Sequence, residues 1–167
     1  TWTDGERFVG FGHPMMHIGS TEMPATSVYV HQIVPSQINS FKLGSAVRAL
    51  GTIYQDRQAG IGGRMGAIPA MLPVTVDVTS GSEANRTEFS VMRHRDMTPI
   101  LVRSVLISAM ESAEKLTGDA ALSLRAAIAL RNGRSVEYEQ FYSGPSAALV
   151  ASIEAVQPMV AIARSPF

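Results

Sequence analysis

Cysteine is absent from this chain of 167 residues, and long apolar runs and lysine are scarce. Without cysteine the protein has no disulfide framework, no thiol nucleophile and no zinc–thiolate site. No run of about 18 apolar residues occurs, so the sequence predicts no transmembrane segment. No secretory signal is visible, and because the sequence begins with Thr1 rather than methionine we expect a processed or partial chain.

The formal net charge is zero, and charged residues make up only 17% of the chain. This balance argues against nucleic acid and anionic membranes as partners, because both require a clustered positive surface. Of the 14 basic residues only Lys42 and Lys115 are lysine, which fits burial inside a larger protein assembly. The length is sufficient for one domain, or one and a half, with a proper core.

The first half of the sequence predicts short strands separated by glycine-containing turns. Alternating and β-branched residues predict strands at 8–11, 25–34, 46–56 and 73–80, and a hairpin partner for the last of these at 86–92. The glycine-rich segment 60–66 predicts a flexible turn. This pattern is typical of a β-barrel or sandwich rather than a doubly wound sheet.

The pattern changes at Thr98, where a helix is predicted with Thr98 as N-cap, Pro99 at its first position and Gly118 just beyond its end. Asn132-Gly133 predicts the turn of a second hairpin. A second helix is expected over 143–158, and a closing strand over 159–163. We therefore expect an α+β module over 96–167, and we find no internal repeat in the sequence.

His13 lies between Gly12 and Pro14 at the end of an apolar strand. This position suits either a turn with an incidental polar ring or a catalytic histidine held at a strand end. His13 and His17 also have the spacing of two zinc ligands on one helical face. Because Gly12 and Pro14 disfavour a helix there, and a third ligand (Glu22 or His31) would have to be recruited by the fold, we predict no metal site.

The remaining candidate residues have simpler explanations. His31 and His94 are interpreted as structural or solvated side chains. The segment 60–66 lacks the residues and the glycine spacing of a phosphate-binding loop, so no cofactor is predicted. The serines at 80, 82, 143 and 146 lie at a hairpin end or a helix start, without the strained turn of a nucleophile elbow. Since acyl transfer needs a nucleophile as well as a base, the residues alone give His13 no mechanism.

Three stretches in order resemble the SpoIVB-type serine peptidase family: "FVGFGHP" (8–14), "LGTIYQDRQAGIGGRMG" (50–66) and "MLPVTVDV" (71–78). The similarity extends from residue 1 to about residue 92. It implies a mainly β protein in which 1–95 form part of a chymotrypsin-like antiparallel barrel and 96–167 a smaller α+β module. It also implies that His13 is the catalytic base. Asp56 occupies a motif position, but the sequence does not place it near His13.

The chain departs from this family at the nucleophile, because the G-M-S-G-S-P motif that contains it is absent. The sequence is more similar to a branch of large exported bacterial proteins in which that motif precedes the G-H-P segment. This similarity implies that the chain is the C-terminal part of a longer protein, located outside the cytoplasm in the periplasm or at the cell surface. The expected partners are the remaining part with the serine motif and a protein or peptide substrate.

Two functions remain open from the sequence. One is a serine endopeptidase whose base is His13 and whose serine lies outside this chain, so that the chain alone is inactive. The other is a catalytically inactive structural or accessory subunit of a larger complex. The missing serine motif, the neutral charge and the scarcity of lysine are compatible with the second function.

Overall fold

The computed structural model describes residues 1–11, 13–113 and 118–165, and it is mainly β with helices in its C-terminal part. The chain divides into two compact units, Thr1–Ala70 (unit 1) and Met71–Phe167 (unit 2). The division therefore differs from the expected one between residues 95 and 96. Its cause is the hairpin at 71–92, which packs against the first helix of unit 2.

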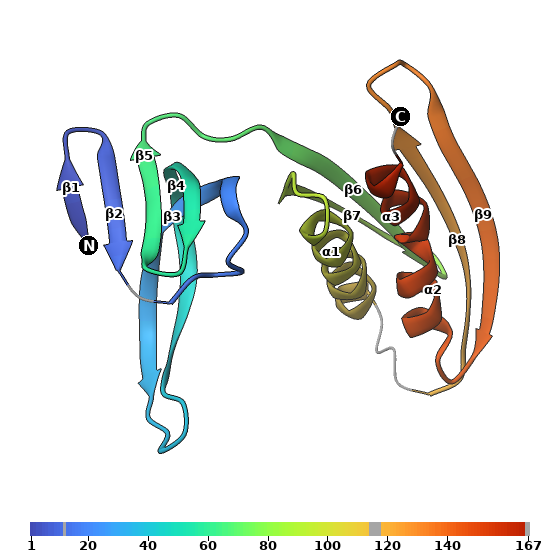
Figure 1. Ribbon diagram of the computed structural model, residues 1–167. Helices are drawn as coiled ribbons and strands as arrows, with labels where there is room; N and C mark the ends of the chain where they lie inside the picture. Colours follow the sequence, from blue (N-terminus) through green and yellow to red (C-terminus); the bar gives the residue numbers. More distant parts are fainter. Residues whose placement is uncertain (12, 114–117, 166–167) are drawn as a thin grey trace. The chain divides into compact units, whose positions relative to one another are not determined.

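Unit 1 is a single antiparallel sheet of five strands in the order β1-β2-β5-β4-β3 (Figure 1). The strands are β1 (Trp2–Asp4), β2 (Arg7–Phe11), β3 (Gly19–Val34), β4 (Phe41–Arg57) and β5 (Gly60–Met65). Among the described residues no strand pairs with the outer edge of β1 or of β3, so the sheet is open and does not close into a barrel.

The predicted turn at 60–66 is wrong, because these residues form β5, the central strand between β2 and β4. Glycine is required there by close approach of the chains rather than by a turn. A β-carbon on Gly63 would overlap the ring of Phe8 and the carbonyl oxygen of Thr52. Three of the six residues of β5 are glycine, so the strand has no alternation of apolar and polar side chains, and the sequence pattern could not reveal it.

The core of unit 1 is small for a sheet of this size. Its buried positions are Met23, Gly51, Thr52 and Asp56. The strands at 25–34 and 46–56 are confirmed, but both extend further. The part of β4 before residue 51 pairs only with β3, because β5 pairs with β4 from Gly51 onward. We call this two-stranded extension, residues 25–50, the β3–β4 arm. Its apolar side chains are exposed on both faces: Val28, Tyr29, Val30, Ile33, Ile38, Phe41, Leu43 and Val47.

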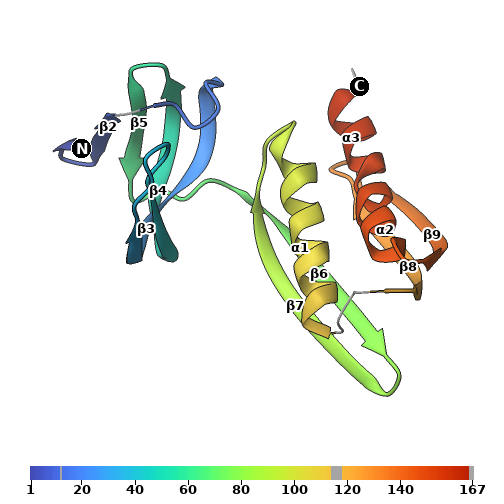
Figure 2. The ribbon, with the colours of Figure 1, turned by 90° about the horizontal axis from the view of Figure 1, so that it is seen from below.

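Unit 2 consists of a hairpin followed by a helix, twice in succession (Figure 2). The first set is β6 (Met71–Ser80), β7 (Glu83–Met92) and α1 (Met97–Ala113). The second is β8 (Ala120–Ala129), β9 (Ser135–Gly144) and the consecutive helices α2 (Ala147–Ala155) and α3 (Gln157–Arg164). The sequence showed no repeat, because the two sets share a pattern of elements but not of residues.

Each hairpin of unit 2 packs one face against its own helix. Val91 of β7, Val102 of α1 and Val156, between α2 and α3, are buried together in one cluster. Tyr142 of β9 is buried with Ala147 and Ala151 of α2 in a second cluster. The helices α1 and α2 also contact each other, so they lie together beneath the two hairpins.

Tyr142 combines this packing with a polar contact. Its hydroxyl donates to the carboxylate of Glu154 at 2.9 Å. Burial, and then the hydrogen bond to Glu154 and its negative charge, raise the pKa of Tyr142 to about 12. Tyr142 is therefore neutral over the whole physiological pH range, and its hydroxyl keeps the proton that it donates in the hydrogen bond to Glu154.

The closing strand predicted at 159–163 is wrong, because these residues belong to α3. Pro158 does not end the preceding helix but occupies the first turn of α3, where proline has no hydrogen bond to lose. Met159 then packs against the first cluster. By length and composition alone, Ala147–Arg164 is apolar enough to cross a membrane, with a mean hydropathy of 1.3, as core helices also can be.

The first helix of unit 2 begins one residue before the expected N-cap. The Nδ1 atom of His94 accepts the amide N–H groups of Asp96 and Met97 at 3.2 Å each. The Thr98 hydroxyl turns back, accepts the amide of His94 at 2.7 Å and donates to the carbonyl of Met92 at 2.9 Å. His94 therefore caps the helix in place of Thr98, which confirms its structural role. The expected helix end at 114–117 lies outside the described residues.

Candidate functional site

His13 lies in the irregular segment 13–18, which connects β2 to β3. Its side chain is exposed, and Nδ1 lies 2.9 Å from the carbonyl oxygen of Pro14. A carbonyl oxygen can only accept, so Nδ1 carries the proton in this arrangement. In the neutral ring Nε2 then has a free electron pair, which is the tautomer that a general base needs. The neighbouring Gly12 lies outside the described residues.

Asp56 of β4 holds the segment that follows His13. Its carboxylate is fully buried at 0% exposure. The amides of Met15 and Met16 donate to its two oxygens at 2.8 Å each, and the amide of Ile18 donates at 3.4 Å. The segment 15–18, which lies 38 to 41 residues before Asp56 in the sequence, is thereby fixed to the sheet.

The electrostatics of Asp56 agree with an ionised carboxylate in this role. Burial on its own raises the pKa of Asp56, but hydrogen bonds from the amides of Met16, Met15, Ile18 and His17 together outweigh it. They hold the pKa below its ordinary value of 3.8. Several backbone N–H groups therefore converge on one buried negative charge.

His17 completes the turn around Asp56. Its backbone φ of +57° lies in the left-handed region, where a residue other than glycine is uncommon. This conformation helps to direct successive amides toward the same carboxylate. The helix that a two-histidine zinc site would need is therefore not formed, because residues 13–18 are irregular. In the described part of the chain no cluster of three metal-ligating side chains occurs.

The structure thus brings Asp56 to the segment of His13 but not to its ring. Both carboxylate oxygens accept backbone amides, and no described residue offers a carboxylate hydrogen bond to the imidazole. Asp56 is a positioning residue for the peptide segment. The sequence signal was present, since Asp56 lies in a motif position, but its hydrogen-bond partners could not be deduced without the fold.

The surroundings of His13 are apolar and exposed. Phe11 is 74% exposed and Met15 is 60% exposed, and Met16 is also open to solvent. Large apolar side chains on both sides of an exposed polar ring are unusual on a free surface. Three apolar side chains close to His13 in the sequence are therefore open to solvent.

The other candidates in unit 1 are His31 and the segment 60–66, whose first residue, Gly60, pairs with Phe11 of β2. His31 is on the β3–β4 arm, where its Nε2 lies 2.9 Å from the Ser45 hydroxyl and its ring meets that of Tyr29 edge-on at 5.1 Å. These contacts agree with the structural interpretation of His31. The segment 60–66 is a strand, and close backbone approach explains its glycines.

Comparison with known proteins adds no relative. A scan of family models, a search of curated proteins and a search of solved structures each found no match. Inference about function therefore depends on the motifs in the sequence and the geometry around His13.

Proposed function

We propose that the chain is part of a serine endopeptidase-like domain, with His13 as general base and with the nucleophilic serine on a segment outside this chain. The observation that supports this proposal most directly is the contact between Nδ1 of His13 and the Pro14 carbonyl, within a segment pinned by Asp56. It favours the tautomer that accepts a proton at Nε2. The motif resemblance supplies the type of nucleophile.

In the proposed reaction Nε2 of His13 accepts the serine hydroxyl proton as the oxygen attacks the scissile carbonyl. The imidazolium then gives this proton to the leaving amine, so that the peptide bond breaks and an acyl-serine remains. Water repeats the sequence with His13 as base, releasing the acid and restoring the serine. The Pro14 carbonyl takes the orienting place that a carboxylate has in the usual triad.

The open sheet of unit 1 supports a missing segment. Both outer edges, β1 and β3, are without a paired strand among the described residues, and the exposed apolar residues flank His13 and cover the β3–β4 arm. An open apolar edge is an association hazard that proteins normally cover. We propose that the serine-containing segment supplies further strands and completes a chymotrypsin-like barrel.

The test uses the full-length protein and a fluorophosphonate probe that labels activated serines. We expect one serine outside residues 1–167 to be labelled, and His13→Ala to reduce the labelling rate by at least about a hundredfold. His17→Asn is the matched control: it removes a histidine from the same segment, and asparagine tolerates the positive φ found there. The purified 167-residue chain should not react.

Labelling that is equal in His13→Ala and His17→Asn would refute the assignment of the base. Stoichiometric labelling of a serine within the 167-residue chain would refute the location of the nucleophile. Circular dichroism of both variants checks that the fold is retained, so that a loss of labelling reports on chemistry.

A second candidate function is an inactive structural subunit of a larger complex. The specific observation in its favour concerns Asp56, the carboxylate in the motif. Both of its oxygens accept backbone amides, so it does not orient the ring of His13. If this function is correct, folded His13→Ala protein will support the cellular role of the wild type. Asp56→Ala will not, because it releases the segment.

A further inference from the structure

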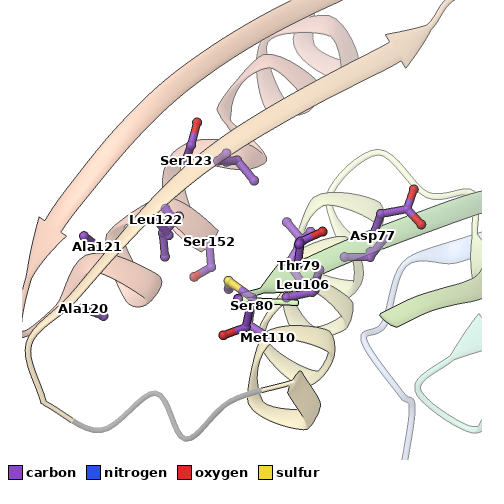
Figure 3. Close-up of a pocket in the computed structure, with 15 residues that line it drawn as sticks. Asp77, Thr79, Ser80, Leu106, Met110, Ala120, Ala121, Leu122, Ser123 and Ser152 are labelled. Carbon is purple, nitrogen blue, oxygen red and sulfur yellow. The ribbon is translucent and has the colours of Figure 1, made fainter. Parts of the chain in front are cut away.

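Two strand edges line one cavity in unit 2. It has a volume of about 450 Å³ and is lined by residues 76–81 of β6 and the turn after it, residues 120–124 of β8, and the helices α1 and α2 (Figure 3). β6 pairs only with β7, and β8 only with β9, so each presents an edge on which no strand is paired in the described part of the chain. We call this cavity the strand slot.

The hairpin registers show which backbone groups of β6 point away from β7. Ser80 pairs with Glu83 across the two-residue turn, and the pair that flanks such a turn is a hydrogen-bonded one. Hydrogen-bonded and non-hydrogen-bonded pairs then alternate along the ladder. Asp77 and Thr79 therefore direct their N–H and C=O groups away from β7, on the edge that lines the slot.

The same argument applies to β8. The amide of Leu130 donates to the carbonyl of Arg134 at 2.8 Å, which makes this a hydrogen-bonded pair. Alternation along the ladder then places Ala121 and Ser123 in non-hydrogen-bonded pairs. Their backbone groups point away from β9, and both residues line the slot. Outward backbone donors and acceptors thus occur on both of its sides.

The floor of the slot is apolar. Val76 and Val78 of β6 and Leu122 and Leu124 of β8 alternate with the exposed residues and face the helices. Leu106 and Met110 of α1 complete the floor, and Figure 3 shows both near Ser80 of β6. An extended segment in the slot would place every second side chain on this floor, as a strand of a half-buried sheet does.

We propose that the strand slot binds an extended peptide segment by β-augmentation on both edges, which would join the two hairpins into one five-stranded sheet. The occupant must have both of its own edges unpaired, because a strand lies on each side of the slot. A strand at the edge of a folded sheet has only one, so a second copy of the chain does not satisfy the geometry. The lining of β6, residues 76–81, corresponds to about 20 Å of strand, the length of five or six residues.

Charge indicates one side chain of the peptide. Asp77 is the one charged residue among the described residues that line the slot, and it is exposed. Its carboxylate lies 3.7 Å from Arg86 of β7, which is also 3.7 Å from Glu88, so one arginine is shared by two carboxylates and the group keeps a net negative charge. A lysine or arginine on the outer face of the bound segment would lie beside it. The recognised class is therefore an extended peptide with apolar residues at alternate positions and a basic residue between two of them.

The experiment uses the 167-residue chain and a fluorescein-labelled octapeptide in which valine alternates with threonine, with one central threonine replaced by lysine. Binding is measured by fluorescence anisotropy. Thr79→Pro removes an outward amide of β6, whereas Ala84→Pro removes the outward amide of its cross-strand partner on the far edge of the hairpin. Neither should break the β6–β7 ladder, since 79 and 84 form a non-hydrogen-bonded pair.

We expect Thr79→Pro to weaken peptide binding by roughly tenfold, with Ala84→Pro unchanged, because proline both lacks the donor and obstructs the incoming strand. A peptide of the same composition with its valines contiguous should bind at least about tenfold more weakly. In the wild type, amide hydrogen exchange at residues 77, 79, 121 and 123 should slow on binding, and exchange at 84 should not.

Three results would overturn the proposal. They are equal binding to the two proline variants, equal binding of the contiguous-valine peptide, and no protection of the slot amides at saturating peptide. Analytical ultracentrifugation supplies the remaining outcome: concentration-dependent dimers that Thr79→Pro abolishes would assign the slot to a second copy and exclude the peptide. None of these measurements depends on His13 or on peptidase activity.

Discussion

Replacing Asp56 with asparagine should destabilise unit 1 while leaving unit 2 intact. The change removes the negative charge and one of the two acceptor oxygens that bind the amides of Met15 and Met16. Asparagine turns an NH₂ group toward the amide that loses its acceptor, so two donors face each other in a site at 0% exposure. The segment with His13 is then released from β4.

The magnitude follows from the hydrogen bonds. One bond to a charged group contributes about 1.5–3 kcal/mol, and a buried donor left without an acceptor costs about 1–3 kcal/mol. The two contributions overlap, because they describe the same amide in part, and we expect a loss of about 2–5 kcal/mol in the free energy of unfolding of unit 1. Asp4→Asn, an exposed carboxylate of β1, is the control, with an expected change within about 0.5 kcal/mol.

Two signals separate the units in one urea titration of the 167-residue chain. The one tryptophan, Trp2, belongs to unit 1, so its fluorescence follows that unit. All described helices belong to unit 2, so circular dichroism at the helical band follows the other. Asp56→Asn should shift the fluorescence transition to lower urea and leave the helical transition in place. Coincidence of the Asp56→Asn and Asp4→Asn fluorescence curves would refute the proposed role of Asp56.

The dependence on pH has a definite sign. The folded-state pKa of Asp56 is held below its ordinary value of 3.8, so the carboxylate contributes stability above pH 3.8. This contribution is lost as pH falls through the folded-state pKa, because the folded state must then take up the proton. Below pH 3.8 the urea midpoint of the fluorescence transition should therefore fall more steeply with decreasing pH in the wild type than in Asp56→Asn. Parallel curves would contradict this linkage.

Three further predictions concern single positions. Gly63→Ala should destabilise unit 1 by about 2–3 kcal/mol by overpacking, whereas Gly62→Ala, whose β-carbon would meet only a side-chain atom at 3.7 Å, should stay within about 1 kcal/mol. His94→Ala should cost about 1 kcal/mol of helix stability by circular dichroism, and His94→Asn should retain the cap. Tyr142→Phe should remove the titration near pH 12 of one tyrosine in ultraviolet absorbance. It should also remove the stability that the wild type loses between pH 10 and about 12 as the pair with Glu154 breaks.

The strands with alternating side chains were predictable from the sequence. β3, β4 and β6 contain β-branched or apolar residues at every second position, and each was predicted at the correct place although too short. Helix α1 was predicted from its periodicity and from Pro99. In β6 and α1 the residue pattern follows burial, because one face of each packs in the core of unit 2. β3 and β4 were recognised from alternation and β-branched residues, although the β3–β4 arm is exposed on both faces.

The errors occur where another part of the chain decides the structure. β5 is a strand because β2 and β4 pair with it on both sides, and its glycines are required by the backbones and side chains around them. α3 is a helix because α2 precedes it and Met159 reaches the core, although its residues would suit a strand. The repeat in unit 2 was invisible because its two hairpins have different turns, of residues 81–82 and 130–134, and its helices have different lengths.

The candidate site was only half predictable for the same reason. The motif indicated both His13 and Asp56, but a motif cannot tell whether a carboxylate binds an imidazole or a set of amides. The fold selects the amides, since Asp56 lies on the buried face of β4 where the segment 15–18 crosses it. A buried carboxylate that fixes the backbone after His13 leaves the ring to be oriented by its own neighbour, Pro14.

The two proposed partners follow from one physical property of the chain, its unpaired strand edges. Unit 1 exposes the edges of β1 and β3 next to apolar side chains, and it has few buried residues to stabilise it alone. A two-stranded ribbon such as the β3–β4 arm is marginal in water unless a further surface covers it. Unit 2 has its own two clusters, and its unpaired edges line a cavity of limited size rather than an open sheet. These differences support the proposal of a large, permanent partner for unit 1, and the proposal of a short peptide that unit 2 binds and releases without losing its fold.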